Sequence, residues 1–336
     1  MVVEENKKQG KVTPSPEASP LWGEDRGEGK GINSGVSMRI LITGACGMLG
    51  RDLVEILSVG HELYLLDVKP FPTPLSSQFS TITLDITDSE KTYKELTKIN
   101  PDIVLHTAAY TDVDGSETNR DLAFRVNALG TRNIALACQK FDTELLYIST
   151  DFVFDGEKNE PYLEFDVPNP QSIYAKSKYW GELYIEFLLN RFYIVRSSWL
   201  FGKNWENFVT KILNLAKEKK EIEVVNDQTG SPTYTKDLAQ AIAQLIGAER
   251  GDYSTRASLY GIWHITNSGQ CSWYEFAREI LQDSDVQVKP ITSEKLNRPA
   301  KRPKFSVLDN YVWRLQGWES LRDWKEALKD YLKEIG

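Results

Sequence analysis

Short apolar runs alternate with longer amphipathic segments from Met38 to about residue 199. Continuously apolar runs are typical of parallel strands buried on both faces, and the amphipathic segments are typical of the helices that cover them. Because such units wind with right-handed crossovers, we expect an α/β fold, a doubly wound parallel sheet with its binding crevice at the carboxyl ends of the strands. The predicted strands are Arg39–Thr43, Glu62–Asp67, 81–84, 102–107, 144–149 and 193–197, and the predicted helices are Met48–Leu57, 117–139 and 174–190.

The alternation weakens after residue 199, where loops rich in Gly, Pro and Asn separate the amphipathic segments. We interpret residues 199–336 mainly as a smaller lobe over the crevice, with some segments that return to the sheet. Residues 1–37 contain almost nothing to bury, which predicts a flexible N-terminal extension and makes Met38 a second candidate for the natural start. The helices predicted in the lobe lie near 205–219, 235–248, 272–283 and 318–335.

The composition narrows the classes of function. A chain of 336 residues, 41% hydrophobic and 26% charged, is ordinary for a globular protein of one large or two closely joined domains. Its net charge of −8 argues against a nucleic-acid partner, and no apolar run approaches the ~18 residues of a membrane span. The dispersed cysteines and histidines predict no disulfide framework and no metal site, and they fit a reducing, cytoplasmic location.

The sequence GACGMLG follows the first predicted strand and opens the first predicted helix. Glycines let the backbone turn sharply and approach a pyrophosphate, whose charge is met by free N–H groups at a helix N-terminus. This context predicts dinucleotide binding, with residues 38–198 as a Rossmann-like domain and residues 199–336 mainly as the substrate-binding lobe. The loop residues expected to contact the cofactor are Gly44, Cys46, Gly47, Met48, Leu49 and Gly50.

Asp67, at the end of the second predicted strand, is expected beside the adenosine ribose. A carboxylate accepts hydroxyl protons and repels a phosphate, which favours NADH. Lys69 is close enough in sequence to meet a 2′-phosphate, which favours NADPH. Both cofactors therefore stay open.

The segment SIYAKSKYWGE places Tyr174 and Lys178 one helical turn apart, just after a Pro-Asn-Pro break. In a helix this spacing puts both side chains on one face, within reach of one small molecule. A solvated pair on a surface helix has the same spacing, so the pair by itself is weak evidence of catalysis.

Taken together, the glycine spacing and the Tyr-x-x-x-Lys pair resemble the extended short-chain dehydrogenase/reductase family. Further motifs narrow the resemblance to the dTDP-4-dehydrorhamnose reductases within it, and it covers the chain after Met38. It implies hydride transfer from NADPH or NADH to the C4 ketone of a dTDP-linked 6-deoxy sugar. The motifs are DITD (85–88), AAYTDVD (108–114), STDFVFDG (149–156), YAKSK (174–178), SSWLFG (197–202), NDQTGSPT (226–233) and RPKFSVLD (302–309).

The resemblance implies that Tyr174 is the proton donor, that Lys178 assists it and holds the nicotinamide ribose, and that the Thr150 hydroxyl bonds the substrate carbonyl. An ammonium ~4 Å from the phenol would stabilise the phenolate by about 4 kcal/mol at an effective dielectric of ~20, or roughly 3 pKa units. We therefore expect Lys178 to lower the pKa of Tyr174 toward neutrality. By the same matching, the residues expected along the cofactor are Asp85, Ile86, Ala108, Ala109, Tyr110 and Asn127.

Several matched positions keep two interpretations. Asn127 either lies near the cofactor or is a backbone-bonding core residue. Trp199 would stack on an apolar sugar face or simply pack, and Arg302 would meet the substrate diphosphate or brace the C-terminal lobe. Phe152 departs from the family, in which tyrosine is common, and the lost hydroxyl leaves the sugar open. The substrate-side positions implied by the resemblance are Val113, Asp114, Thr150, Phe152, Trp199 and Arg302.

Other functions share these features. A 4-epimerase or 4,6-dehydratase uses the same fold, but a dehydratase needs an Asp-Glu pair after the threonine, and here Asp151 is followed by Phe152. The regulatory β subunit of methionine adenosyltransferase also resembles these reductases, although the intact chemistry residues favour the enzyme. Relatives can form homodimers, some with Mg²⁺ at the interface. A homodimer is therefore one expectation, while no carboxylate spacing in the chain indicates Mg²⁺.

Overall fold

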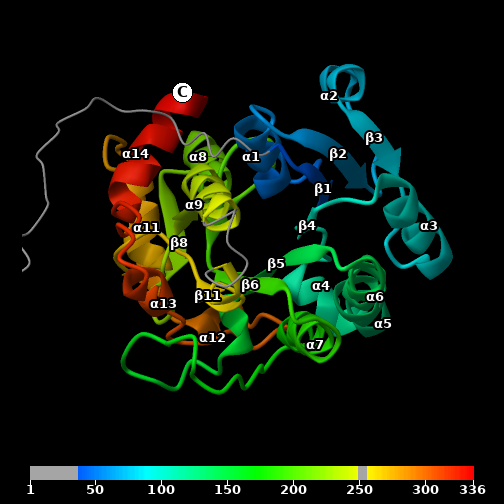
Figure 1. The fold of residues 1–336 in the computed structure, drawn as a ribbon. Coiled ribbons are helices and arrows are strands. Elements are labelled where there is room, and N and C mark those ends of the chain that lie inside the picture. Colours follow the sequence, from blue (N-terminus) through cyan, green and yellow to red (C-terminus); the bar gives the residue numbers. More distant parts are fainter. Residues whose placement is uncertain (1–36, 249–255) are drawn as a thin grey trace, which may run out of the picture. The chain divides into compact units, whose positions relative to one another are not determined.

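A seven-stranded, fully parallel sheet forms the centre of the computed structural model, which describes residues 37–248 and 256–336 (Figure 1). The strand order is β11-β6-β5-β4-β1-β2-β3, so the order reverses between β1 and β4, where open α/β sheets form their crevice. The predicted doubly wound fold is confirmed, and the predicted extension lies, apart from Ser37, outside the described residues. The strands are β1 (Arg39–Thr43), β2 (Glu62–Asp67), β3 (Ser80–Thr83), β4 (Ile103–His106), β5 (Glu144–Thr150), β6 (Phe192–Ser197) and β11 (Gly261–His264).

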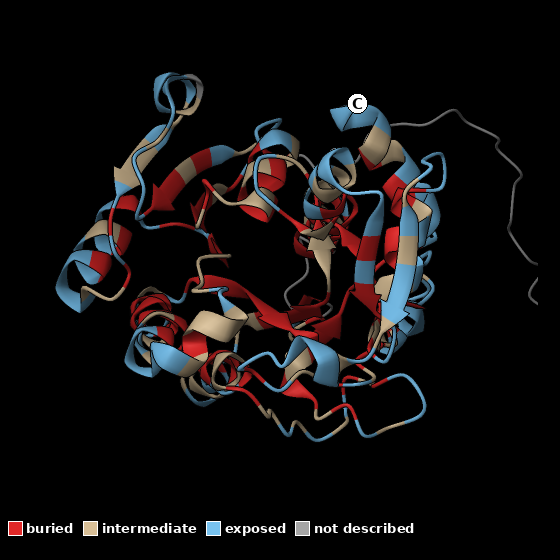
Figure 2. Ribbon diagram, turned by 180° about the vertical axis from the view of Figure 1, so that it is seen from behind, coloured by how far each residue is buried: buried red, intermediate tan, exposed pale blue. Residues whose placement is uncertain are grey.

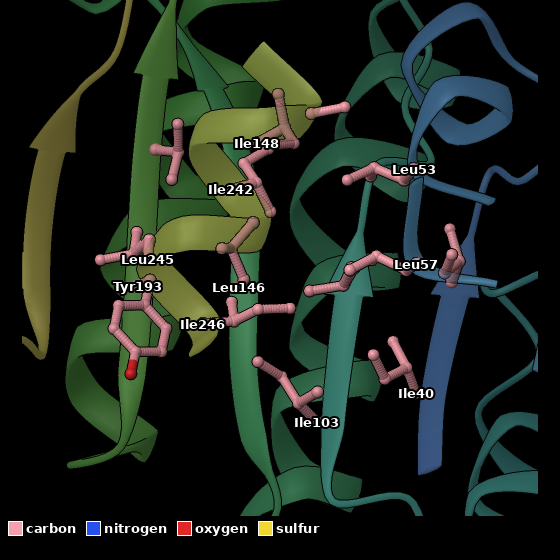
Figure 3. Close-up of a cluster of buried hydrophobic side chains, with 14 of the residues drawn as sticks. Ile40, Leu53, Leu57, Ile103, Leu146, Ile148, Tyr193, Ile242, Leu245 and Ile246 are labelled. Atoms are coloured by element: carbon pink, nitrogen blue, oxygen red, sulfur yellow. The ribbon is translucent and has the colours of Figure 1, made fainter. Parts of the chain in front are cut away.

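Helices cover both faces of this sheet. On one face α1 (Met48–Leu57) and α9 (Thr235–Gly247) pack side by side on the strands, and Figure 3 shows their aliphatic side chains meeting those of Ile40, Ile103 and Leu146. The other face is covered by α3 (Ser89–Ile99), α6 (Thr131–Phe141) and α7 (Ile173–Leu188). The inner strands β1, β4, β5 and β6 are consequently buried on both sides (Figure 2), which is why their sequences are largely apolar, whereas the edge strand β3 has no buried residue.

The helix predicted over 117–139 is wrong as one element. The chain forms α4 (Val113–Thr118) and α5 (Arg120–Phe124), a π-helical turn over Arg125–Gly130, and then α6. Asn119 leaves the helical conformation and its side-chain amide caps the carbonyl of Gly115, which ends α4. A π-helical turn inside a helix usually re-aims side chains, and here it carries Asn127 toward the sheet.

Residues beyond 199 build a second core and also return to the sheet. The strand β11 and the helices α9 and α13 (Tyr311–Leu315) belong to the sheet's own core, whereas aromatic and aliphatic residues of α8, α11 and α14 form a separate cluster. The last helix begins at Trp324 rather than at Trp318, because Trp318 follows Gly317 at a φ of +73° and stacks on Trp263. The remaining elements are α2 (Thr73–Gln78), the 3₁₀ turn Asp151–Val153, β7 (Leu200–Phe201), α8 (Phe208–Glu218), β8 (Glu221–Val225), β9 (Thr229–Gly230), β10 (Thr233–Tyr234), β12 (Cys271–Ser272), α11 (Trp273–Ile280), β13 (Gln287–Ile291), α12 (Ser293–Leu296) and α14 (Trp324–Ile335).

None of the helices in the two described ranges combines the length and apolar character that crossing a bilayer requires. Within the same ranges, no group of three or more His, Cys, Asp or Glu side chains is arranged to hold a metal ion. All three cysteines are buried free thiols.

Candidate active site

The glycine loop joins β1 to α1 at the strand edge where the sheet order reverses. Gly44 has a φ of +70°, and a Cβ there would lie 2.6 Å from the backbone nitrogen of Ala108. A Cβ on Gly50 would lie 2.4 Å from the carbonyl oxygen of Gly44, so the loop packs tightly onto the first turn of α1. That helix has Gly47 as its N-cap and no side-chain cap. Its first amides are therefore left for an anion, and the loop fits a cofactor pyrophosphate.

Asp67 lies at the end of β2 and is buried. Its carboxylate accepts hydrogen bonds from the backbone N–H groups of Cys46 at 2.9 Å and Lys69 at 3.0 Å, and so ties the glycine loop to β2. The ammonium of Lys69 lies 3.8 Å from the centroid of the Trp205 ring. Since both charges have partners within the chain, this geometry does not choose between a ribose hydroxyl and a 2′-phosphate.

The residues expected further along the cofactor lie at the ends of β3 and β4. Asp85 accepts the N–H of Thr87 at 2.9 Å, and Ile86 is buried against Gly130, where a Cβ would lie 2.8 Å from its Cδ1. Ala108, Ala109 and Tyr110 follow β4 directly and are partly buried.

Asn127 bonds the backbone in this structure. Its side-chain oxygen accepts the N–H of Tyr110 at 2.8 Å, and its amide donates to the Tyr110 carbonyl at 3.0 Å and to the Ser177 hydroxyl at 2.9 Å. The core interpretation of Asn127 therefore has direct support, because the residue fixes the β4 loop against α7.

Thr150 and Tyr174 meet at the carboxyl edge of the sheet. Thr150 ends β5, and Tyr174 lies in the first turn of α7, whose N-cap Ser172 accepts the N–H of Ala175 at 3.2 Å. Burial raises the pKa of Tyr174 to about 12, while the neighbouring Thr150 side chain lowers it and the charge of Asp151 raises it further. The phenol is consequently protonated at neutral pH and lies next to the threonine.

Lys178 does not lower the pKa of Tyr174 as we expected. Its ammonium is buried, donates to the carbonyl of Ile148 at 2.7 Å and lies 4.1 Å from the centroid of the Tyr147 ring. Burial lowers the pKa of Lys178 to about 7, and the nearby charge of Glu182 raises it. The predicted electrostatic assistance is wrong for this arrangement, because the helical spacing fixes a shared face but not the direction of a long side chain.

Asp151 is a site residue that sequence reasoning did not assign. Its carboxylate accepts hydrogen bonds from the hydroxyls of Thr150 at 3.1 Å and Ser306 at 2.6 Å. Burial raises its pKa to about 7, although both hydrogen bonds lower it. The STD motif marked this position, but only the fold brings Ser306 to it.

Arg302 holds the segment 298–302 against α4. Its guanidinium donates to the carboxylate of Asp114 through two hydrogen bonds of 2.9 Å, and Arg298 adds a third at 3.0 Å. Together with the N–H of Ala300, these groups lower the pKa of Asp114 to about 2. The fork joins α4, which starts at Val113, to the segment 298–302, so this geometry favours the bracing interpretation of Arg302.

The two aromatic positions have different surroundings. Trp199 adopts a φ of +49° and stacks on Trp273 with ring centroids 3.5 Å apart, and a Cβ on Gly230 would lie 2.4 Å from its ring. Its packing interpretation therefore has direct support. Phe152 meets the Tyr174 ring edge-on at 6.1 Å. A tyrosine at this position would add a second hydroxyl to this pair of rings.

A nicotinamide-binding sheet that carries a Thr, Tyr and Lys set at its carboxyl edge is the architecture of the extended short-chain dehydrogenases/reductases, in which the cofactor supplies the hydride. Comparison with known proteins places the chain more narrowly. It belongs to the RmlD substrate binding domain family, which matches residues 38–336.

Individual relatives agree with this assignment. The chain is 38% identical over 296 residues to a dTDP-4-dehydrorhamnose reductase of Streptomyces griseus, with 87% of this chain and 92% of the relative covered. It is 37% identical over 299 residues to the spore coat polysaccharide biosynthesis protein SpsK of Bacillus subtilis, covering 88% and 97%. The solved structure of a Bacillus anthracis dTDP-4-dehydrorhamnose reductase in complex with NADP matches with a TM-score of 0.80, at 41% identity, covering 89% of this chain and 100% of that one.

Proposed function

We propose that the protein reduces the C4 ketone of dTDP-4-dehydro-6-deoxy-L-mannose (dTDP-4-dehydrorhamnose) to give dTDP-L-rhamnose, with NADPH or NADH as the reductant. The observation that carries this proposal is the buried Tyr174 phenol, which is protonated and lies next to Thr150 at the edge of the sheet to which the glycine loop also belongs. The named reductases that match nearly the whole family region support the same substrate class.

In the proposed mechanism, Tyr174, Thr150 and Lys178 are the catalytic residues. A bound nicotinamide supplies the hydride. Tyr174 gives its proton to the carbonyl oxygen as that oxygen becomes an alkoxide, and Thr150 orients the same oxygen by a hydrogen bond. A tyrosine whose pKa lies near 12 is a weak acid toward water, but an alkoxide is more basic still, so the transfer is downhill.

Binding roles are assigned as proposals. The glycine loop from Gly44 to Gly50 would hold the pyrophosphate, with Asp67 stabilising that loop. Lys178 would hold the nicotinamide ribose. The bidentate pair of Asp114 and Arg302 would shape the sugar pocket, and Phe152 would border it.

Two further assignments are proposed with it. The outer face of α7 exposes Trp180 and Phe187, which are 45% and 75% exposed, and burial of such side chains would favour a homodimer. Sedimentation velocity tests this directly. A cytoplasmic location fits three free, buried thiols.

The test is a spectrophotometric assay with the purified protein, dTDP-4-dehydrorhamnose and either NADPH or NADH. We expect loss of the reduced-cofactor absorbance and formation of dTDP-L-rhamnose, and the ratio of kcat/KM values gives the cofactor preference. The matched control replaces the substrate with a UDP-linked 4-keto sugar. If neither cofactor is oxidised although both bind, the regulatory function related to methionine adenosyltransferase would replace the enzymatic one.

A further inference from the structure

The last three residues of β5 hold one face of α7 step by step. The carbonyl of Ile148 accepts a hydrogen bond from the ammonium of Lys178, the hydroxyl of Ser149 donates to the carboxylate of Glu182, and Thr150 lies next to the phenol of Tyr174. Tyr174, Lys178 and Glu182 follow each other at one-turn spacing, so they share that face. The site already described uses the first two of these α7 residues and leaves Glu182 without a role.

Glu182 is completely buried, as is its partner on β6. Arg196 donates to its carboxylate from Nε at 3.1 and 3.2 Å and from Nη2 at 2.7 Å. The remaining nitrogen, Nη1, has no hydrogen-bond partner and the guanidinium faces the ring of Phe154 at 5.2 Å. A buried ion pair is weak evidence for stability, because replacing it with apolar residues is often neutral or stabilising. Stability alone therefore does not explain the Glu182–Arg196 ion pair, and a functional role for its charge can be tested.

The surroundings of Lys178 provide that reason. It is a buried cation whose hydrogen bond goes to a neutral carbonyl, and Glu182 is the carboxylate whose charge favours its ammonium form. The neighbouring imidazole of His106 is itself neutral, since burial and the charge of Lys178 lower its pKa to about 3. The titratable groups that interact with Lys178 are His106 from β4, Tyr147 from β5 and Glu182 from α7. Tyr174 lies one turn before Lys178 on the same helix face, and Arg196 of β6 bonds Glu182.

We propose that Glu182 is a positioning residue whose negative charge, fixed by Ser149 and Arg196, holds the Lys178 ammonium against the end of β5. The effect of Lys178 on turnover rests on the proposed function. The effect of Glu182 on the protonation of Lys178 does not. Arg196 bonds the Glu182 carboxylate and carries the opposite charge. Its removal would therefore leave the Glu182 charge uncompensated and favour the ammonium form of Lys178.

The test compares Glu182→Gln with Arg196→Met, which leave opposite charges behind. The pKa of Lys178 itself is read by competitive acetic anhydride labelling and peptide mass spectrometry between pH 5.5 and 9, and kcat/KM is measured over the same range. We expect Glu182→Gln to move both profiles about 1 unit toward lower pH, and Arg196→Met to move them about 1 unit toward higher pH.

The matched control is Glu144→Gln. Glu144 is equally buried at the other end of β5 and pairs with Arg191 and Arg256, far along the strand from Lys178. The Glu144→Gln variant should be less stable than the wild type, but its labelling profile and its kcat/KM profile should not shift. If Glu182→Gln is too unstable to purify, the double variant Glu182→Gln/Arg196→Met keeps the region neutral and should shift the labelling profile downward by less than the single variant would.

Equal profiles in all variants, or shifts in the same direction for Glu182→Gln and Arg196→Met, would overturn the inference and leave a purely structural ion pair. Failure of the proposed function looks different. In that case the wild-type protein does not oxidise NADPH with the keto sugar, while the labelling profiles still shift in opposite directions.

Discussion

The proposed cofactor side and the proposed substrate side of the crevice are built in different ways. The centre of the cofactor side is one contiguous stretch, residues 39–67, in which a strand, a glycine loop, a helix and a second strand follow each other, although residues 85–86, residues 108–110 and Lys178 are added from further along the chain. The substrate side brings together Asp114, Phe152, Trp199 and Arg302 from separate segments, and its main ion pair spans 188 positions. The first side is determined by local backbone geometry, whereas the second exists only when the whole chain has folded.

The largest effect is expected where the two sides meet, at Tyr174. Tyr174→Phe removes only the transferable proton, so turnover should fall by about 100- to 10,000-fold while cofactor affinity is unchanged. Steady-state kinetics and cofactor titration by fluorescence measure the two quantities. Tyr179→Phe, on the same helix, is the control and should keep full activity. Unchanged turnover in Tyr174→Phe would show that another group donates the proton.

The next largest effect concerns the cofactor side. Gly44→Ala places a Cβ 2.6 Å from the Ala108 nitrogen at a φ of +70°, so the loop must move and the cofactor Kd should rise at least about 100-fold. Gly60→Ala is a matched control, because Gly60 also has a positive φ, of +97°, but nothing lies within 4 Å of its Cβ position. Equal cofactor affinity in both variants would contradict the tight packing of the loop.

Asp151 links the two sides, and its titration gives a pH-dependent prediction. Its pKa in the folded chain is about 7, above the ordinary 3.8, so its contribution to stability is complete below pH 4 and is lost as the pH rises to 7. Asp151→Asn removes this loss. The free energy of unfolding of Asp151→Asn minus that of the wild type should therefore be about 2 to 3 kcal/mol larger at pH 8 than at pH 5, which means that the variant gains stability relative to the wild type at the higher pH.

Urea unfolding at the two pH values measures this difference. Asp155→Asn serves as the control, because the pKa of Asp155 is lowered by hydrogen bonds from Asn169, Glu157 and Tyr162, and its loss should not favour high pH. A difference for Asp151→Asn that does not depend on pH would mean that Asp151 is ionised in the folded protein at pH 5.

A smaller effect is expected from the substrate-side brace. Arg302→Met removes both arms of the fork on Asp114, and we expect the KM for the keto sugar to rise about tenfold with cofactor Kd unchanged. Arg298→Met removes a contact with the same carboxylate from an exposed position and should change KM less than about threefold. A parallel loss of cofactor affinity in Arg302→Met would show that the two sides are not independent.

The smallest effect is expected for a substitution on the substrate side, at Phe152. Phe152→Tyr restores the hydroxyl common in the family beside Tyr174, and one added hydrogen bond would change kcat/KM for the keto sugar by less than about tenfold. Phe165→Tyr, on an exposed ring that meets Tyr311, is the control. A change in cofactor Kd for Phe152→Tyr would move this residue to the cofactor side.

Elements whose signal is local could be predicted from the amino-acid sequence. The bounds of β1, α1 and β2 were predicted to the residue, because continuous apolar runs and a glycine loop leave few other conformations. Because such units wind right-handed, the sequence also predicts that the carboxyl ends of the strands, Thr150 among them, lie at one edge of the sheet.

The contacts of long side chains, and of residues far apart in the chain, could be seen only in the folded protein. Lys178 shares a helix face with Tyr174 but extends to the Ile148 carbonyl, and Asp67 is occupied by backbone N–H groups of its own loop. Arg302 binds Asp114, and Trp318 lies outside the helix predicted for it and stacks on Trp263. These outcomes depend on partners far away in the chain, and a sequence pattern fixes the period of an element but not which distant groups its side chains meet.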